Sequence, residues 1–366
     1  MPQKTLFTFM IILLMFLLIL FPNLCLQSAQ NGLLLWFNKV LPSLLPFMIF
    51  INILVPLDGL SKLITFSSPF SKKLWHLPGH SFFAFIMGLI AGYPMGAKVV
   101  RALYMDHKLT KEEAELTLCF SNNCGPLFIV GTIGTAMLSC TSIGYFLFFI
   151  HLLSALIMSL LTTRNHTLSP SRNRILPPSD TNPSFSYIFN QGIINAMDTI
   201  VYMGGYIIFF SVIIALLTQT PLATTLINFT FSSSTVGSLF TGVLSGFFEL
   251  SNGSHILSLV TPFSVYTIAL IAGVISFGGL CVYFQTLYVL EDSHLSTKTY
   301  LLSKCLQSLL SFSLTLLIYP FYTLYTQKTS LALSYPILLQ GLLLLGGCLF
   351  IGYFVFLPHS PLHHPA

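Results

Sequence analysis

Long apolar runs dominate this sequence and leave few fold classes open to it. Eight runs of about 20 residues, the length that crosses a bilayer as an α-helix, follow one another along the 366 residues. Only 7% of the residues are charged, whereas a soluble domain carries about 25%, so the chain cannot cover a water-exposed surface. We therefore expect an all-α polytopic membrane protein. The predicted spans are 5–27, 37–57, 113–137, 143–162, 194–218, 263–289, 300–326 and 332–356.

The first apolar run raises the alternative of a cleaved secretory signal. Such a signal has an apolar core of about 7–15 residues followed by small residues at the cleavage point. The run at 5–27 is longer, and the sequence from Pro22 to Cys25 is a poor cleavage or lipidation site. We predict an uncleaved span here.

Two further apolar stretches contain residues that interrupt a helix. Residues 81–105 are broken at Gly92 to Gly96, and residues 236–257 are broken at Glu249 to Gly253. We expect both stretches to be re-entrant helical hairpins that enter and leave on one side. Irregular backbone at that depth is stable only where protein or a water-filled cavity covers it.

The distribution of Lys and Arg predicts the orientation. With the N-terminus in the cytoplasm and the eight spans threaded in order, thirteen of the 15 Lys and Arg residues fall on the cytoplasmic side and two outside. This bias follows the positive-inside rule, so both termini are expected in the cytoplasm. The outside residues are Lys39 and Lys328, and the cytoplasmic residues are Lys4, Lys62, Lys72, Lys73, Lys98, Arg101, Lys108, Lys111, Arg164, Arg172, Arg174, Lys298 and Lys304.

The two halves of the chain resemble each other at an offset of about 157 residues, which pairs Gly96 with Gly253 and Cys124 with Cys281. Each half has three crossings and one hairpin, so the second half enters the membrane in the opposite orientation. This is the inverted-topology repeat of many secondary transporters. The expected organisation is an N-terminal anchor at 1–30, a first repeat at 31–163, a cytoplasmic linker at 164–190, a second repeat at 191–326, and a C-terminal helix with its tail at 327–366.

Breaks in membrane helices free backbone groups that can hold a solute or an ion. Besides the two hairpin tips, we expect breaks at 120–127, which contains two Asn, a Gly and a Pro, and at the Gly-rich segment 277–281. Gln285 is expected to reach the same cavity. The structural alternatives are kinked, Gly-packed helices and hydrogen bonding between helices by Asn.

Glu249 is the acid that this reading places deepest, and a carboxylate at depth usually faces a polar cavity. It would bind a solute hydroxyl, a coupling cation or a proton; a tip near the interface is the alternative. Asp198 and the capping box of Thr110 and Glu113 are assigned structural roles. No nucleophile–base pair, phosphate loop or metal-ligand spacing of Cys and His is visible, so we predict neither an enzyme nor a metal site. The net charge of +5 is explained by topology rather than by nucleic-acid binding.

Three motifs together resemble a known family. They are Gly-Tyr-Pro-Met-Gly-Ala-Lys at 92–98, Phe-Ser-Asn-Asn-Cys-Gly-Pro-Leu-Phe at 120–128, and Glu-Leu-Ser-Asn-Gly at 249–253. The sequence resembles the YlbJ family of sporulation integral membrane proteins, whose nucleoside-recognition (Gate) domain is similar to the core of concentrative nucleoside transporters. The resemblance implies that 93–96 and 122–123 form the first tip and first unwound helix, and 249–253 the second tip. The Gln-Thr-Glu triplet of those transporters is missing at the first tip. Family membership implies passage of dipicolinic acid from the mother cell towards the forespore.

We therefore expect a secondary-transporter-like protein of the bacterial cytoplasmic membrane, in sporulating cells of the membrane around the forespore, whose partners are a small solute and lipid. The alternatives are a nucleoside-like solute and a non-transporting structural or assembly protein of the sporulation membrane. No cofactor is expected beyond a coupling cation or proton, which Glu249 would bind. The predicted solute-binding residues are Tyr93, Pro94, Gly96, Asn122, Asn123, Ser251, Asn252 and Gly253.

Overall fold

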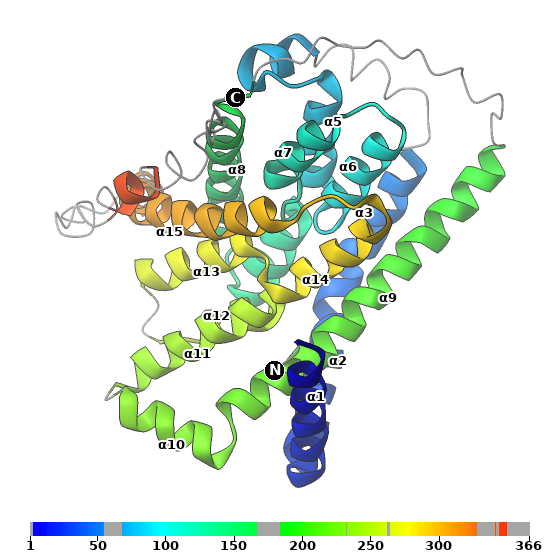
Figure 1. Cartoon of the computed structure of the whole chain (residues 1–366). Coiled ribbons are helices and arrows are strands. Elements are labelled where there is room, and N and C mark those ends of the chain that lie inside the picture. Colours follow the sequence, from blue (N-terminus) through cyan, green and yellow to red (C-terminus); the bar gives the residue numbers. More distant parts are fainter. Residues whose placement is uncertain are drawn as a thin grey trace, which may run out of the picture.

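The computed structural model describes residues 3–54, 68–166, 184–231, 233–261, 264–327, 341 and 344–349, and these residues form helices and connecting turns without any strand (Figure 1). An all-helical fold is therefore confirmed for the described chain. The N-terminal helices are α1 (Gln3–Leu20), α2 (Pro22–Leu35), the π-helical turn η1 (Trp36–Val40) and α3 (Leu41–Leu54). They are followed by α5 (Gly79–Ala91), α6 (Met95–Met105), α7 (Lys111–Ser121), the π-helical η2 (Leu127–Met137) and α8 (Thr141–Thr163).

The second half begins with α9 (Phe185–Thr218), which starts inside the predicted linker. It continues with α10 (Pro221–Thr230), α11 (Ser234–Phe248), α12 (Leu250–Ser258), α13 (Val265–Phe277), α14 (Gly279–Leu290), the 3-10 turn η3 (Glu291–Ser293) and α15 (Lys298–Gln327). The capping box predicted at the start of α7 is present, because Thr110 Oγ1 accepts from the Glu113 N–H and Glu113 accepts from the Thr110 N–H.

Four helices of the described chain are long and apolar enough to cross a membrane, or six if each bent pair of helices is one span. The four correspond to the predicted spans 143–162, 194–218, 263–289 and 300–326. They are Thr141–Thr163, Phe185–Thr218, Val265–Ser293 and Lys298–Tyr322. The predicted span 332–356 lies mostly outside the described residues.

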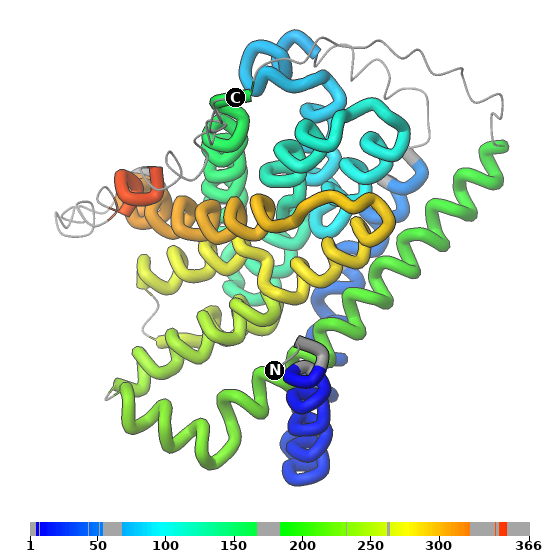
Figure 2. Tube along the Cα trace, viewed as in Figure 1, coloured from blue at the N-terminus to red at the C-terminus, as the bar shows by residue number. Residues whose placement is uncertain are grey.

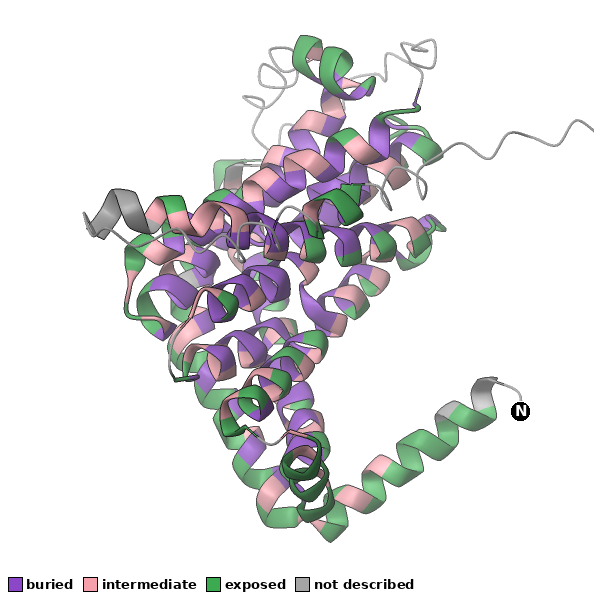
Figure 3. Ribbon diagram, turned by 90° about the vertical axis from the view of Figure 1, so that its left-hand side faces the viewer, coloured by how far each residue is buried: buried purple, intermediate pink, exposed green. Residues whose placement is uncertain are grey.

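The N-terminal span departs from the prediction. Instead of one crossing at 5–27, the helices Thr8–Leu20 and Pro22–Val40 meet at a bend of 100°. Phe21 leaves the helical conformation, and Pro22 starts the next helix, where its missing N–H costs nothing. The backbone then stays helical through η1 to Leu54. Helix α1 projects away from the rest of the molecule and is exposed along most of its length (Figure 3).

Both predicted hairpins contain a break where the sequence places it. The first separates α5 from α6 at Gly92, whose φ of 81° is open to glycine, and the second separates α11 from α12 at Glu249. The arms of each hairpin pack closely: a Cβ on Gly88 would lie 2.9 Å from the Gly96 Cα, and one on Gly253 would overlap the Gly246 backbone. The trace turns back on itself at both points (Figure 2).

The order of elements recurs along the chain. A long helix, a hairpin, a broken helix and a second long helix appear first in α2 to α8 and again in α9 to α15. The breaks at Gly92 and Glu249 are 157 residues apart, as are the first residues of α8 and α15, Thr141 and Lys298. The two halves therefore share one arrangement of elements at the offset that the sequence predicts.

Candidate functional site

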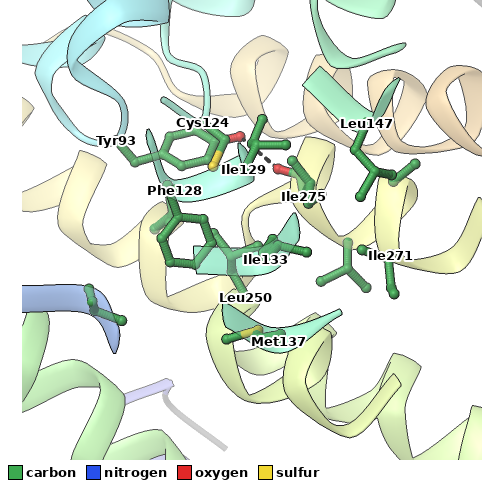
Figure 4. Packing of buried hydrophobic residues seen from close by; sticks show 14 of the residues in the cluster. Tyr93, Cys124, Phe128, Ile129, Ile133, Met137, Leu147, Leu250, Ile271 and Ile275 are labelled. Atoms are coloured by element: carbon green, nitrogen blue, oxygen red, sulfur yellow. Dashed lines mark hydrogen bonds between the residues drawn. The ribbon is translucent and has the colours of Figure 1, made fainter. Parts of the chain in front are cut away.

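A small cavity lies where the two hairpin tips meet the two broken helices. Its volume is about 40 Å³, enough for one or two water molecules but too small for an aromatic solute. Tyr93 of the first tip lies over this region beside Cys124, Phe128 and Leu250 (Figure 4). The lining residues are Leu44, Ala91, Gly92, Tyr93, Cys124, Gly125, Phe128, Met203, Ile207, Glu249, Leu250, Ser251, Cys281, Val282 and Gln285.

Glycines bring the tips onto the breaks. Helix α7 ends at Ser121, and the backbone stays unwound to Gly125. A Cβ on Gly88 or on Gly96 would overlap the Ser121 carbonyl oxygen, and one on Gly92 would lie 3.0 Å from the Gly125 nitrogen. The first hairpin therefore rests directly on the first break.

The second hairpin rests on the second break in the same way. Gly278 and Gly279 separate α13 from α14 with φ angles of 85° and 83°. A Cβ on Gly279 would lie 3.0 Å from the Phe248 carbonyl oxygen, and one on Gly278 would lie 3.2 Å from the Tyr93 ring. The hydroxyl of Tyr93 donates to the carbonyl oxygens of Ile275 at 3.3 Å and Ser276 at 3.4 Å (Figure 4). One side chain thus links the first tip to the second break.

Glu249 is 3% exposed and lines the cavity from the second tip. Its carboxylate caps α12: Oε1 accepts from the Ser251 N–H at 2.8 Å, and Oε2 accepts from the Asn252 N–H at 2.7 Å. The side-chain amide of Asn252 donates to Oε2 at 3.0 Å and to Ser211 Oγ at 2.9 Å. The helix N-terminus therefore stabilises the ionised carboxylate at this depth.

Gln285 is the second polar group that faces this cavity, as the sequence predicts. Its Nε2 donates to the Cys281 sulfur at 3.2 Å, which fixes the amide. Its Oε1 is buried and has no hydrogen-bond partner among the described residues. An unpaired amide oxygen and a carboxylate on one cavity are acceptors suited to a cation or to a solute donor.

The two asparagines of the first break are fully buried but point away from the cavity into neighbouring helices. Asn122 Nδ2 donates to Tyr300 Oη at 2.8 Å and to Thr286 Oγ1 at 3.0 Å. Asn123 Nδ2 donates to the Phe120 carbonyl oxygen at 2.6 Å. Their neighbours Cys124 and Gly125 line the cavity instead.

His151 of α8 holds the same break from another side, and the sequence gave no signal for it beyond one His within an apolar run. Its Nε2 accepts from the Cys124 N–H at 3.1 Å, so Nδ1 carries the proton and donates to Ser276 Oγ at 2.9 Å. Ser276 meets Ser311 at 2.6 Å, Ser311 donates to Ser154 at 2.8 Å, and Ser154 donates to the His151 carbonyl oxygen at 2.8 Å. This closed ring of hydrogen bonds joins α8, α13 and α15.

Lys304 of α15 corrects the topology argument. The charge count places it on the cytoplasmic side, whereas its side chain is 1% exposed in the structure. Its Nζ donates to Gln307 Oε1 at 2.8 Å and to Asn123 Oδ1 at 3.3 Å. A charge count cannot separate a Lys at the membrane surface from one that turns inward along a partly polar helix face. The other cytoplasmic assignments do not depend on it.

The predicted site residues therefore fall into two groups. Tyr93, Glu249 and Ser251 line the cavity together. Gly96 and Gly253 make the close backbone contacts of the hairpins, and Asn252 lies in a separate polar groove with Ser211, His255 and Lys39. Pro94 follows a cis peptide bond and begins α6 beside Asn122 and Asn123, which brace the break.

Comparison with known proteins supports the resemblance inferred from the motifs. Residues 37–139, which include the first hairpin and the first break, match the Gate family, described as nucleoside recognition. The chain is 27% identical over 325 residues to the sporulation integral membrane protein YlbJ of Bacillus subtilis, an alignment that covers 82% of this chain and 79% of the relative. No solved structure matches the chain significantly. The chain is therefore a helical membrane protein that carries a Gate nucleoside-recognition region and resembles the YlbJ sporulation protein over most of its length.

Proposed function

We propose that this protein is a secondary transporter that moves a small polar or anionic solute across a sporulation membrane. One observation carries the proposal: two helical hairpins and two broken helices converge on one cavity that contains a carboxylate and an unpaired amide oxygen. A purely structural protein gains nothing from such an arrangement, because broken helices and buried polar groups lower stability. A transporter needs them to replace the hydration shell of its solute.

The proposed mechanism is alternating access by an inverted repeat. The constant offset of 157 residues between matching elements supports a repeat, and three crossings in each unit would invert the second relative to the first. The cavity of about 40 Å³ would then belong to a closed form. Movement of one tip would open it to one side of the membrane.

Dipicolinic acid is the proposed solute, carried from the mother cell towards the forespore. The similarity to a sporulation protein supports the setting. A nucleoside-like solute is the second candidate, and the description of the matching Gate region favours it. Glu249 would bind the coupling cation or proton, because an ionised carboxylate would otherwise repel a dianion in the same cavity.

The direct test is uptake of labelled dipicolinate and labelled nucleosides into proteoliposomes that contain the purified protein. We expect saturable uptake of dipicolinate, and a matched decrease of dipicolinate in spores that lack the protein. Saturable uptake of nucleosides alone would select the second candidate. No uptake of either, with normal dipicolinate in the spores, would contradict the transporter proposal and favour the structural role.

A further inference from the structure

A lysine near the start of α15 is buried in the centre of the molecule, where α15 passes beside α7, α8 and α13 (Figure 1). The Nζ of Lys304 contacts Gln307 Oε1 and Asn123 Oδ1 and lies 5.4 Å from the centre of the Tyr93 ring. Carbonyl oxygens and an aromatic face are the groups that hold an ammonium ion. All three neighbours are uncharged, and no ion pair within the described part of the chain includes Lys304.

The repeat shows that the fold itself does not require this charge. At the offset of 157 residues, Lys304 corresponds to Leu147 of α8, and Gln307 corresponds to Ile150. All four side chains are buried. One scaffold position is thus filled by leucine in the first repeat and by lysine in the second. Because burial of an unpaired ammonium is far costlier than burial of leucine, a charge retained there marks a functional position.

Lys304 lies behind the part of the cavity wall that a moving tip would open. Tyr93 lines the cavity and also contacts Nζ with its ring. Asn123 binds Nζ and immediately precedes Cys124, which lines the cavity. Glu249 lines the same cavity from the second tip. The closed cavity is therefore bordered by one acid, and a cation lies directly behind its opposite wall.

We propose that Lys304 selects an anionic solute: when the first tip moves and Tyr93 withdraws, the ammonium pairs with a carboxylate of the solute. The inference rests on the proposed function, since it uses the same cavity, and it adds that the solute is a carboxylate anion. In the closed form, Asn123, Gln307 and the Tyr93 ring hold the ammonium in place of that carboxylate. The negative partner that the protein lacks would be supplied by the cargo.

Cys124 provides a native probe of the charge in this cavity. The six other cysteines are replaced, and the rate of Cys124 modification is measured with two thiol reagents of similar size. One is the anionic sulfonatoethyl methanethiosulfonate and the other is the cationic trimethylammonium-ethyl methanethiosulfonate. The ratio of their rates, corrected for their reactivity with a free thiol, reports the local electrostatic potential without reference to any transported solute.

In the presence of Lys304 we expect the ratio to favour the anionic reagent by about tenfold, the size of effect that one charge at close range produces. Lys304→Gln should abolish most of this preference, and Lys304→Arg should retain it. Lys298→Gln is the matched control, because it removes an exposed charge from the same helix and should leave the ratio unchanged. Each variant is first compared for membrane level and for elution as a monodisperse protein in detergent.

Equal ratios in the parent and in Lys304→Gln would overturn the inference, as would complete protection of Cys124 from both reagents. Uptake of pyridine-2,6-dicarboxylate and its neutral diamide separates this result from the proposed function. If dicarboxylate uptake and the labelling ratio are both unaffected by Lys304→Gln, the role of Lys304 is wrong and the transporter remains. If the ratio depends on Lys304 but the parent moves no dicarboxylate, the proposed solute is wrong and the anion-selecting charge remains.

Discussion

Glu249 combines two roles that make different demands on one carboxylate. As the N-cap of α12, it uses both oxygens to accept from backbone N–H groups of the second tip. As the predicted ion or proton site, it must also interact with a ligand in the cavity that it lines. Each carboxylate oxygen has two lone pairs, so capping leaves acceptor capacity free. The ligand and the helix cap can therefore share the group.

Substitution of Glu249 should reveal both roles. Glu249→Gln retains one oxygen acceptor and puts an NH₂ group against a backbone N–H, so we expect a loss of about 1–2 kcal/mol of stability. Uptake should decrease and lose its dependence on the coupling cation or proton gradient. Glu249→Asp retains the charge and a good capping group and should be milder in both assays. Normal uptake with unchanged ion dependence in Glu249→Gln would exclude a coupling role.

His151 is expected to act through position rather than by contact with solute. His151→Ala would leave the buried Cys124 N–H without its acceptor and open the ring of hydrogen bonds to Ser276. We expect a destabilisation of about 1–3 kcal/mol, measured by thermal unfolding in detergent. His255→Ala is the control, because its Nδ1 has no hydrogen-bond partner in the described structure. A variant as stable as the parent would show that the break is held by its other contacts alone.

Among the helices, the contact between the first hairpin and the first break depends on the absence of side chains. Gly88→Ala would place a Cβ against the Ser121 carbonyl oxygen, which is backbone and cannot rotate away. We expect it to displace the hairpin, lower the unfolding temperature and abolish uptake. Gly131→Ala is the control, since nothing lies within 4 Å of an added Cβ there. Alanine at Gly88 with normal stability and uptake would contradict the packing of the tip on the break.

The elements of the site could be predicted because their signals are local. Gly, Pro and Asn interrupt apolar helices, and the structure breaks at Gly92, at 122–125, at Glu249 and at Gly278. Tertiary contacts could not be predicted in this way. A Lys at the start of α15 looks like an interfacial residue until the fold buries it. The bend at Phe21 was missed because an average of hydrophobicity over a span does not register one proline.

For the molecule as a whole, the two repeats have exchanged polar residues rather than duplicated them. The amides Asn122 and Asn123 correspond to Gly279 and Leu280, and Glu249 corresponds to Gly92. Each repeat thus supplies a part that the other lacks, and the cavity is complete only where they meet. The open ends of the two hairpins lie at different ends of the molecule, with α5 and α6 in the upper part of Figure 1 and α11 at its lower left.

The inverted repeat predicts that these open ends face opposite sides of the membrane. We place a single cysteine at Asp106, which follows α6, or at Ser233, which precedes α11; both residues are exposed, and the native cysteines are removed. With the N-terminus in the cytoplasm, a membrane-impermeant thiol reagent should label Ser233→Cys in intact cells and Asp106→Cys only after permeabilisation. A cysteine at Ser171, in the predicted cytoplasmic linker, should behave like Asp106→Cys. If the two hairpin positions are labelled from the same side, the repeats are parallel, and alternating access by two inverted units is excluded for this protein.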